Sequence, residues 1–202
     1  VIQSSSATTV MVVSFVNAGL MTLRQAIGVI MGANIGTTVT AWIVAFIGFK
    51  MDIAALSLPL MAVAAPLLFI GKGKWKNLGE CIIGFALLFM GLNLLSEAAE
   101  AMEIGKHMGE WLTHIDVNAW WAIPLFLFAG MILTMAMQSS SASMAITLML
   151  FDMNIPGFGL AQAAALAMGQ NIGTTITALL ASFAGNTLAK RAALAHTLFN
   201  VF

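Results

Sequence analysis

The feature that most constrains this chain is a run of uncharged hydrogen-bonding side chains inside a long apolar segment, and it occurs twice. Residues Gln138–Ser143 read Gln-Ser-Ser-Ser-Ala-Ser, and Gln3–Thr8 read Gln-Ser-Ser-Ser-Ala-Thr, 135 positions earlier. Hydroxyls and amides left unpaired in apolar surroundings cost about 2–7 kcal/mol each. The two runs must therefore be satisfied by the protein around them or by something that they bind. They are the first candidates for a functional site.

The surroundings of these runs are typical of a membrane protein. Hydrophobic residues make up 60% of the 202 residues, charged residues only 8%, and the mean hydropathy is +0.98. These values lie outside the range of soluble domains, so we expect an all-α polytopic membrane protein in a lipid bilayer. The zero net charge argues against nucleic acid as a partner, and the single Cys81 excludes a disulfide framework.

A second motif is duplicated as well. Gly32–Thr38 reads Gly-Ala-Asn-Ile-Gly-Thr-Thr, and Gly169–Thr175 differs from it only by Gln for Ala, at an offset of 137. Glycine and β-branched threonine are poor helix formers, so each segment is predicted to break a transmembrane helix. The glycines also recur at spacing four with Gly28 and Ala165, which is typical of a stripe for close helix packing.

The length of the apolar segment around the second polar run predicts a hairpin. Ala119–Phe151 covers 33 residues, about 50 Å as one helix, which is too long for a single crossing of about 30 Å of hydrocarbon. A break at Gln138–Ser141 would fold this segment into a re-entrant helical hairpin. The sequence opens at Val1 without a Met and stops at Phe202 inside an apolar run, so it is expected to be a fragment of a longer chain.

The two motifs divide the chain into two repeats. We predict repeat 1 at residues 1–52, two connecting transmembrane helices at 53–95, an external acidic or interfacial segment at 96–117, and repeat 2 at 118–202. Three spans then separate the hairpins, and an odd number makes the repeats inverted in topology. On this topology six of the eight basic residues share one side, which the positive-inside rule assigns to the cytoplasm of a multi-pass cell membrane protein: Arg24, Lys72, Lys74, Lys76, Lys190 and Arg191.

The residues themselves favour a coupled transporter. Neither motif contains Arg or Lys, so a bound anion needs co-bound cations to balance its charge, and neither contains Asp or Glu as a proton carrier, which favours Na⁺ held by oxygen atoms. Two alternatives use the same residues. One is an anion channel, and the other is an intramembrane serine hydrolase with Ser139 or Ser140 as nucleophile and His196 as base. The duplication argues against the hydrolase, because catalysis needs one activated nucleophile.

The paired Gln-Ser-Ser-Ser runs, the Gly-x-Asn-Ile-Gly-Thr-Thr segments, and Arg191 with His196-x-x-x-Asn200 together resemble the type II sodium-dependent phosphate cotransporters and their bacterial relatives. The resemblance covers essentially the whole chain. It implies Na⁺-coupled symport of inorganic phosphate by alternating access, with Na⁺ as the coupling ion, no cofactor and no catalysis. An alternative substrate for a Na⁺-coupled transporter of this kind is another small oxyanion or a carboxylate. The sequence also leaves open whether the chain forms a homo-oligomer.

The resemblance also implies site residues. Phosphate would bind between the two polar runs, at Gln3, Ser4, Ser5, Ser6, Gln138, Ser139, Ser140 and Ser141. Na⁺ would bind beside them, at Asn34, Thr37, Thr38, Ser143, Asn171, Thr174 and Thr175. The copies differ in two places, because Pro59 stands where the second copy has His196, and Met144 stands where the first has Thr9.

Overall fold

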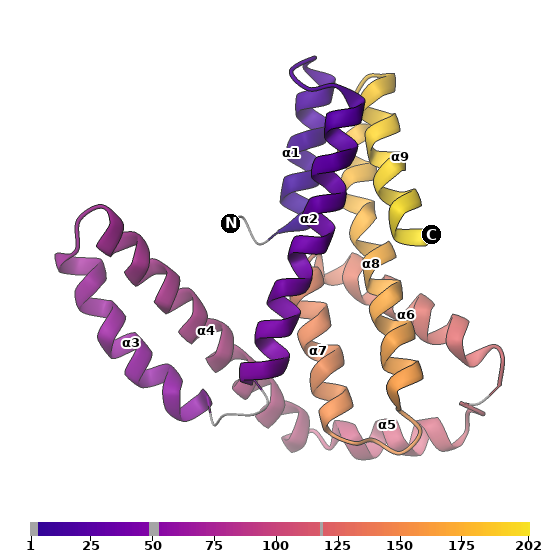
Figure 1. The fold of residues 1–202 in the computed structure, drawn as a ribbon. Helices are drawn as coiled ribbons and strands as arrows, with labels where there is room; N and C mark the ends of the chain where they lie inside the picture. The colour runs from indigo at the N-terminus through magenta and orange to yellow at the C-terminus, as the bar shows by residue number, and fades with distance from the viewer. Residues whose placement is uncertain (1–3, 49–52, 118) are drawn as a thin grey trace. The chain divides into compact units, whose positions relative to one another are not determined.

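The computed structural model describes residues 4–48, 53–117 and 119–202. Within these ranges the chain forms helices and no strand, which confirms the predicted all-α class. In chain order (Figure 1) the helices are α1 Ser5–Asn17, α2 Leu23–Ile43 with a π-helical turn at Val44–Gly48, α3 Ile53–Ile70, α4 Lys74–Ala101, α5 Ile104–Thr113, α6 Ala122–Met137, α7 Ser140–Asp152, α8 Leu160–Ser182 and α9 Thr187–Val201.

The helices divide into two compact units. Unit 1 comprises Val1–Trp42 and Met108–Phe202, so it holds the duplicated motifs of both copies. Unit 2 comprises Ile43–His107 and is built mainly from α3 and α4. Within unit 2 these two helices pack closely, because a Cβ on Gly79 would lie 3.2 Å from the Ala64 carbonyl oxygen.

In unit 1 the corresponding helices of the two copies run in opposite directions. Figure 1 shows α1 rising from the middle of the unit to one end and α2 returning along its length, whereas α7 runs from the middle to the other end and α8 returns. At the first end, Asn186 joins the turn before α9 to the turn after α1. Its backbone N–H donates to Asn17 Oδ1 at 2.7 Å, and its Nδ2 donates to the Asn17 carbonyl at 3.0 Å.

Two apolar clusters hold unit 1 together. The first joins α1, α2, α8 and α9, and it contains Val12, Val13, Val16, Ala26, Ile30, Ala178, Ala189, Ala192 and Ala193. The second lies toward the other end of α8, and it contains Leu112, Phe126, Ile155, Phe158, Ala163, Ala165 and Leu166. Because α8 contributes to both clusters, it is the element that connects the two ends of the unit.

The prediction of a broken helix at Gly32–Thr38 and at Gly169–Thr175 is wrong. Helices α2 and α8 run through these segments without interruption. In apolar surroundings a break leaves backbone groups without partners, a cost larger than the weak helix propensity of glycine and threonine. The threonines bond within the helix instead: Thr37 Oγ1 donates to the Ala33 carbonyl at 3.0 Å, and Thr174 Oγ1 donates to the Gln170 carbonyl at 2.9 Å.

The break predicted in the second polar run is present. Helix α6 ends at Met137, and Gln138 follows with a left-handed backbone at φ 55°. The Gln138 backbone N–H donates to the Thr134 carbonyl, and its side-chain Nε2 donates to the Met135 carbonyl. Gln138 therefore satisfies the exposed carbonyls at the end of α6, and the chain starts α7 in a new direction.

The small-residue stripe has a packing partner in the second copy. A Cβ on Gly169 would collide with the Leu127 carbonyl oxygen of α6, and one on Gly130 would collide with the Leu166 carbonyl oxygen of α8. The backbones of α6 and α8 therefore cross in direct contact. In the first copy the matching Gly32 has nothing within 4 Å of such a Cβ among the described residues.

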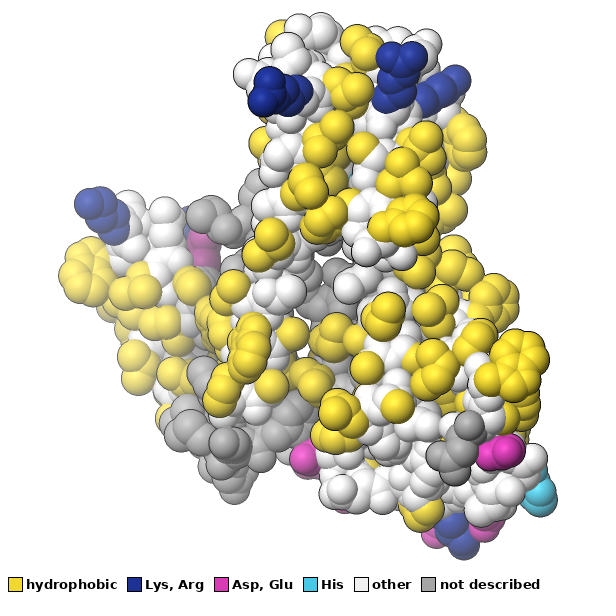
Figure 2. All heavy atoms as spheres, turned by 45° about the vertical axis from the view of Figure 1, so that its right-hand side comes forward, with side chains coloured by type: hydrophobic (Ala, Val, Ile, Leu, Met, Phe, Trp, Pro, Cys, Tyr) yellow, Lys and Arg dark blue, Asp and Glu magenta, His cyan; other side chains and the backbone are white. Residues whose placement is uncertain are grey.

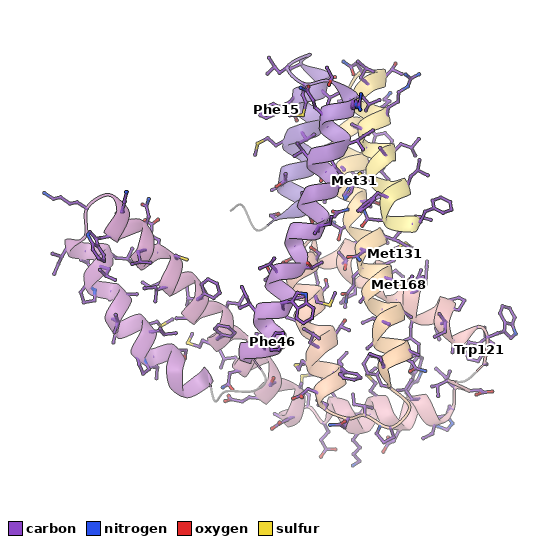
Figure 3. All side chains as sticks on the ribbon, in the orientation of Figure 1. Phe15, Met31, Phe46, Trp121, Met131 and Met168 are labelled. Atoms are coloured by element: carbon purple, nitrogen blue, oxygen red, sulfur yellow. The ribbon has the colours of Figure 1, made fainter. Side chains whose placement is uncertain are left out.

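The outer surface is apolar, as a lipid-facing surface would be. Figure 2 shows hydrophobic side chains over much of the visible face of unit 1, with Lys and Arg side chains at the end that carries the α1–α2 and α8–α9 turns. Phe15, Met31 and Trp121 (Figure 3) are 38, 39 and 40% exposed. Among the described residues, two helical segments are long and apolar enough to cross a membrane, Leu23–Phe46 and Lys74–Ala101.

Candidate functional site

The two polar runs fold into the same local structure. Ser4 and Ser139 each precede a helix with an extended backbone, at φ −140° and −141°, and each side chain accepts a hydrogen bond from the amide three residues later. One turn further on, Thr8 Oγ1 donates to the Ser4 carbonyl at 2.8 Å, and Ser143 Oγ donates to the Ser139 carbonyl at 2.9 Å. Serine and threonine in these positions are good helix N-caps, so the duplicated sequence produces a duplicated helix start.

A cavity of about 290 Å³ brings both helix starts together within unit 1. This volume lies near the lower end of the range for small-molecule sites, about 300–1,000 Å³. From the first copy the cavity is lined by residues of α1 and α2, and from the second by residues of α7, α8 and α9. The lining residues are Ser5, Asn34, Ile35, Thr37, Thr38, Ala41, Ser140, Ser141, Met144, Gln170, Asn171, Thr174, Phe199 and Asn200.

None of the described residues that line this cavity is charged. Its polar groups are serine and threonine hydroxyls and the amides of Asn and Gln. The N-terminal turns of α1 and α7 begin at Ser5 and Ser140, so they add backbone N–H groups and the positive ends of two helix dipoles. These helix ends would favour an anion. Because the helix dipoles carry only partial charges and no lining side chain is charged, most of the negative charge of the anion would have to be balanced by bound cations.

The threonine hydroxyls on the cavity wall are oriented as acceptors. Thr37 and Thr174 donate their protons to the carbonyls four residues earlier, and Thr38 donates to the Ile35 carbonyl at 2.7 Å. With the proton used within the helix, the free lone pairs of each oxygen remain for a ligand. Oxygen lone pairs are the groups that small hard cations prefer.

Eight of the predicted phosphate and Na⁺ ligands line the cavity, and the other predicted ligands that the structure describes do not. From the predicted phosphate set it takes Ser5, Ser140 and Ser141, and from the predicted Na⁺ set it takes Asn34, Thr37, Thr38, Asn171 and Thr174. Ser4, Ser6, Gln138, Ser139, Ser143 and Thr175 do not line it. Ser4 and Ser139 act as helix caps, and Gln138 ends α6. Gln3 lies outside the described residues.

Two polar groups of the site were not among the predicted ligands. Asn200 belongs to the His196-x-x-x-Asn200 pattern, so the sequence contained a signal for it. Gln170 lies inside the seven-residue motif Gly169–Thr175, at the one position where this motif differs from Gly32–Thr38. Both line the cavity, and Asn200 Nδ2 donates to the His196 carbonyl at 2.8 Å.

His196 contacts the site through the opposite copy. Its side chain is fully buried, and Nε2 lies 3.2 Å from Asn34 Oδ1 on α2. Within the described part of the chain, the His196 Nδ1 atom and the Asn34 Nδ2 atom have no hydrogen-bond partner. The imidazole therefore orients an amide of the cavity wall and does not hydrogen-bond to Ser139 or Ser140, the arrangement that the hydrolase alternative would need.

Several known proteins have sequences similar to this chain, and some of them are named as phosphate transport proteins. The sequence profile of the Na⁺/Pi-cotransporter family matches residues 1–97 and 99–202. YqeW of Bacillus subtilis, an uncharacterized protein, is 38% identical over the whole chain, and YjbB of Escherichia coli, provisionally named an inorganic phosphate export protein, is 30% identical over 99% of it. The human sodium-dependent phosphate transport protein 2B is 59% identical over 44 residues, which are 22% of this chain and 6% of that protein.

The chain is shorter than these relatives. It spans 62% of the length of YqeW and 35% of the length of YjbB. No solved structure gives a significant match.

Proposed function

The chain belongs to the Na⁺/Pi-cotransporter family, and from that premise we propose that it forms the substrate-binding part of a membrane transporter that moves inorganic phosphate together with Na⁺. The observation that carries this proposal is the uncharged cavity between the two copies of the duplicated motif. Family membership agrees with the resemblance carried by the doubled motifs.

In the proposed site, phosphate lies at the N-terminal turns of α1 and α7. Ser5, Ser140 and Ser141 offer hydroxyl donors there, and the helix ends offer free backbone N–H groups. Each such group can hydrogen-bond an oxyanion without carrying a full charge. Two opposed helix ends would therefore orient the anion but leave most of its charge uncompensated.

The coupling ions supply the missing charge. We place Na⁺ beside the phosphate at the oxygens of Thr37, Thr174 and Asn171, because the two hydroxyls have already donated their protons to backbone carbonyls. At about 100 mV, inside negative, entry of a dianion is opposed by roughly 4.6 kcal/mol, and each entering cation contributes about 2.3 kcal/mol. At least two cations per dianion are needed to cancel the electrical term.

We propose that the two copies are inverted repeats that support alternating access from either side of the membrane. The opposite directions of α1 and α7, and of α2 and α8, support this view (Figure 1). The gathering of basic side chains at one end of unit 1 supports a cytoplasmic location for that end (Figure 2). The break at Gln138 would then be the tip of one re-entrant hairpin, and the start of α1 at Ser5 would belong to the other.

A second candidate is phosphate export through the same site. The observation that favours it is the similarity to YjbB, which extends over 99% of the chain, whereas the match to the human sodium-dependent transporter covers 22% of it. The cavity serves either direction, because the direction of a carrier is set by the gradients across the membrane.

The test is transport and binding with purified protein. In proteoliposomes, uptake of labelled phosphate should rise with an inward Na⁺ gradient and not with K⁺ at the same concentration. Phosphate uptake that does not change with the Na⁺ gradient would rule out symport, and uncoupled export or a channel would then be the remaining explanations. In binding assays, Ser5→Ala and Ser140→Ala should each weaken phosphate binding by about ten- to a hundredfold, the value of a hydrogen bond to a charged group.

A matched control for these variants is Ser14→Ala. Ser14 lies on α1 but outside the cavity, and its hydroxyl donates to the Val10 carbonyl at 2.9 Å. This variant should bind phosphate as the unmodified chain does. Normal phosphate affinity in both Ser5→Ala and Ser140→Ala would remove the proposed site.

A further inference from the structure

Gln170 is the residue that makes the two halves of the cavity chemically different. It lines the cavity, it is 1% exposed, and the matching position in the first copy is Ala33. The neighbouring Asn, Ile, Gly and Thr residues are identical in the two copies. Whatever Gln170 adds to the site is therefore present in only one half.

The hydrogen bonds around Gln170 fix which end of its amide is free. Nε2 donates to the Ser143 carbonyl at 3.0 Å and to Thr147 Oγ1 at 2.7 Å. Thr147 Oγ1 in turn donates its own proton to the Ser143 carbonyl at 3.3 Å. A carbonyl only accepts, and the Thr147 proton is already used, so both partners require a donor from Gln170. The NH₂ group must therefore face α7, and both of its protons are used there.

The other end of the amide is left with no protein donor. Gln170 Oε1 is buried and has no hydrogen-bond partner among the described residues. A buried acceptor without a donor is costly, so the site is complete only when something else supplies one. An amide oxygen carries no proton, and it can take part only as an acceptor.

The position of Gln170 indicates which ligand meets this acceptor. Through Ser143 it is bonded to the first turn of α7, the turn that contains Ser140 and Ser141 and that favours an anion. Where the Gln170 oxygen meets an anion bound in the cavity, it would repel a fully deprotonated oxyanion, because both groups would present lone pairs. It would attract an oxyanion that still carries a proton.

We propose that Gln170 Oε1 accepts a hydrogen bond from the P–OH group of the bound phosphate and so selects protonated oxyanions over sulfate. This inference rests on the proposed function and adds the class of substrate that the site prefers. Phosphate and arsenate both retain at least one hydroxyl near neutral pH, whereas sulfate retains none. Discrimination by an unsatisfied polar group is effective because the wrong ligand leaves that group unpaired.

The experiment measures competition for bound phosphate in the purified full-length protein. Labelled phosphate is displaced at saturating Na⁺ by unlabelled phosphate, arsenate or sulfate. The unmodified protein should bind arsenate within a few-fold of phosphate and sulfate at least about tenfold more weakly. The Gln170→Met variant keeps the length of the side chain and removes the acceptor, and its preference for phosphate over sulfate should fall by about tenfold.

Two further variants make the test specific. Thr147→Val removes one of the two groups that hold the Gln170 amide without altering the cavity wall, and it should lower the preference in the same direction by a smaller factor. Gln162→Met removes another buried glutamine of α8, whose amide bonds to Gly159 and Val117 outside the cavity. This control should keep the original preference.

The outcomes separate the inference from the function on which it rests. If the unmodified protein binds phosphate but Gln170→Met and Thr147→Val both keep its preference over sulfate, the role of Gln170 is refuted and the transporter proposal stands. A loss of Na⁺ affinity in Gln170→Met with an unchanged preference would also refute it and would make Oε1 a cation ligand. If the unmodified protein binds none of the three oxyanions, the proposed function itself fails.

Discussion

The crossing of α6 and α8 makes one pair of glycine substitutions a sensitive test of the fold. Gly169 and Gly32 occupy the same position of the duplicated motif, and each lies within a continuous helix. In Gly169→Ala the new methyl group would collide with the carbonyl, C and Cα atoms of Leu127, whereas in Gly32→Ala it would meet nothing within 4 Å among the described residues. The two substitutions are chemically identical, so any difference between them comes from packing.

The expected magnitudes follow from two opposing effects. Replacing a mid-helix glycine with alanine is worth about 0.5–1 kcal/mol in favour of the folded state. Overpacking costs typically about 1–3 kcal/mol, and Gly169→Ala should fall at the upper end because the obstructing atoms are backbone and cannot rotate away. We therefore expect Gly32→Ala to stabilise the chain by up to about 1 kcal/mol and Gly169→Ala to destabilise it by about 2 kcal/mol.

Thermal unfolding of the 202-residue chain in detergent, followed by circular dichroism, measures both changes. At about 2–4 °C per kcal/mol for a chain of this size, Gly169→Ala should lower Tm by about 4–8 °C and Gly32→Ala should raise it slightly. If the two variants shift Tm by the same amount in the same direction, the proposed difference between a crossed and an open glycine stripe is wrong.

Three other changes test single contacts of unit 1. Asn186→Ala removes the side-chain bond from Nδ2 to the Asn17 carbonyl and the oxygen that caps α9, while the backbone bond to Asn17 Oδ1 stays, so the free energy of unfolding should fall by about 1–2 kcal/mol in thermal unfolding, with Asn186→Ser recovering part of the loss. His196→Ala deprives Asn34 Oδ1 of its partner and should weaken ligand binding about two- to tenfold in equilibrium binding; a His196→Gln variant that behaves no better would argue against the hydrogen bond. Thr9 is fully buried, and its hydroxyl oxygen has no partner in the part of the chain that the structure describes, so Thr9→Val should leave Tm unchanged or raise it.

The duplicated motifs predicted the local structure of the site well at the helix starts and poorly at the helix interiors. Ser4 and Ser139 cap their helices in the same way because capping is a local property of a few residues. The break at Gln138 also follows from local chemistry, together with the excess length of the apolar segment around it. The predicted breaks at Gly32–Thr38 and Gly169–Thr175 are absent because helix propensity is weaker than the requirement for backbone hydrogen bonds in apolar surroundings.

The sequence alone determined that the chain is a helical membrane protein, that it is internally duplicated, and that its duplicated polar runs carry no charge. These properties depend on composition, on period and on repetition, which can be counted along the chain. Family membership also follows from the sequence, since the match covers nearly every residue.

Only the tertiary structure decided which polar residues share a cavity and which of their hydrogen-bonding groups are available to a ligand. The pairing of His196 with Asn34 joins residues that are 162 positions apart, and the free oxygen of Gln170 is defined by its bonds to α7. The physical reason is that the groups a side chain can offer to a ligand depend on which of them already bond to neighbouring residues. The sequence gives the donor and acceptor groups of each side chain, but only the packed helices show which of these groups have no hydrogen-bond partner.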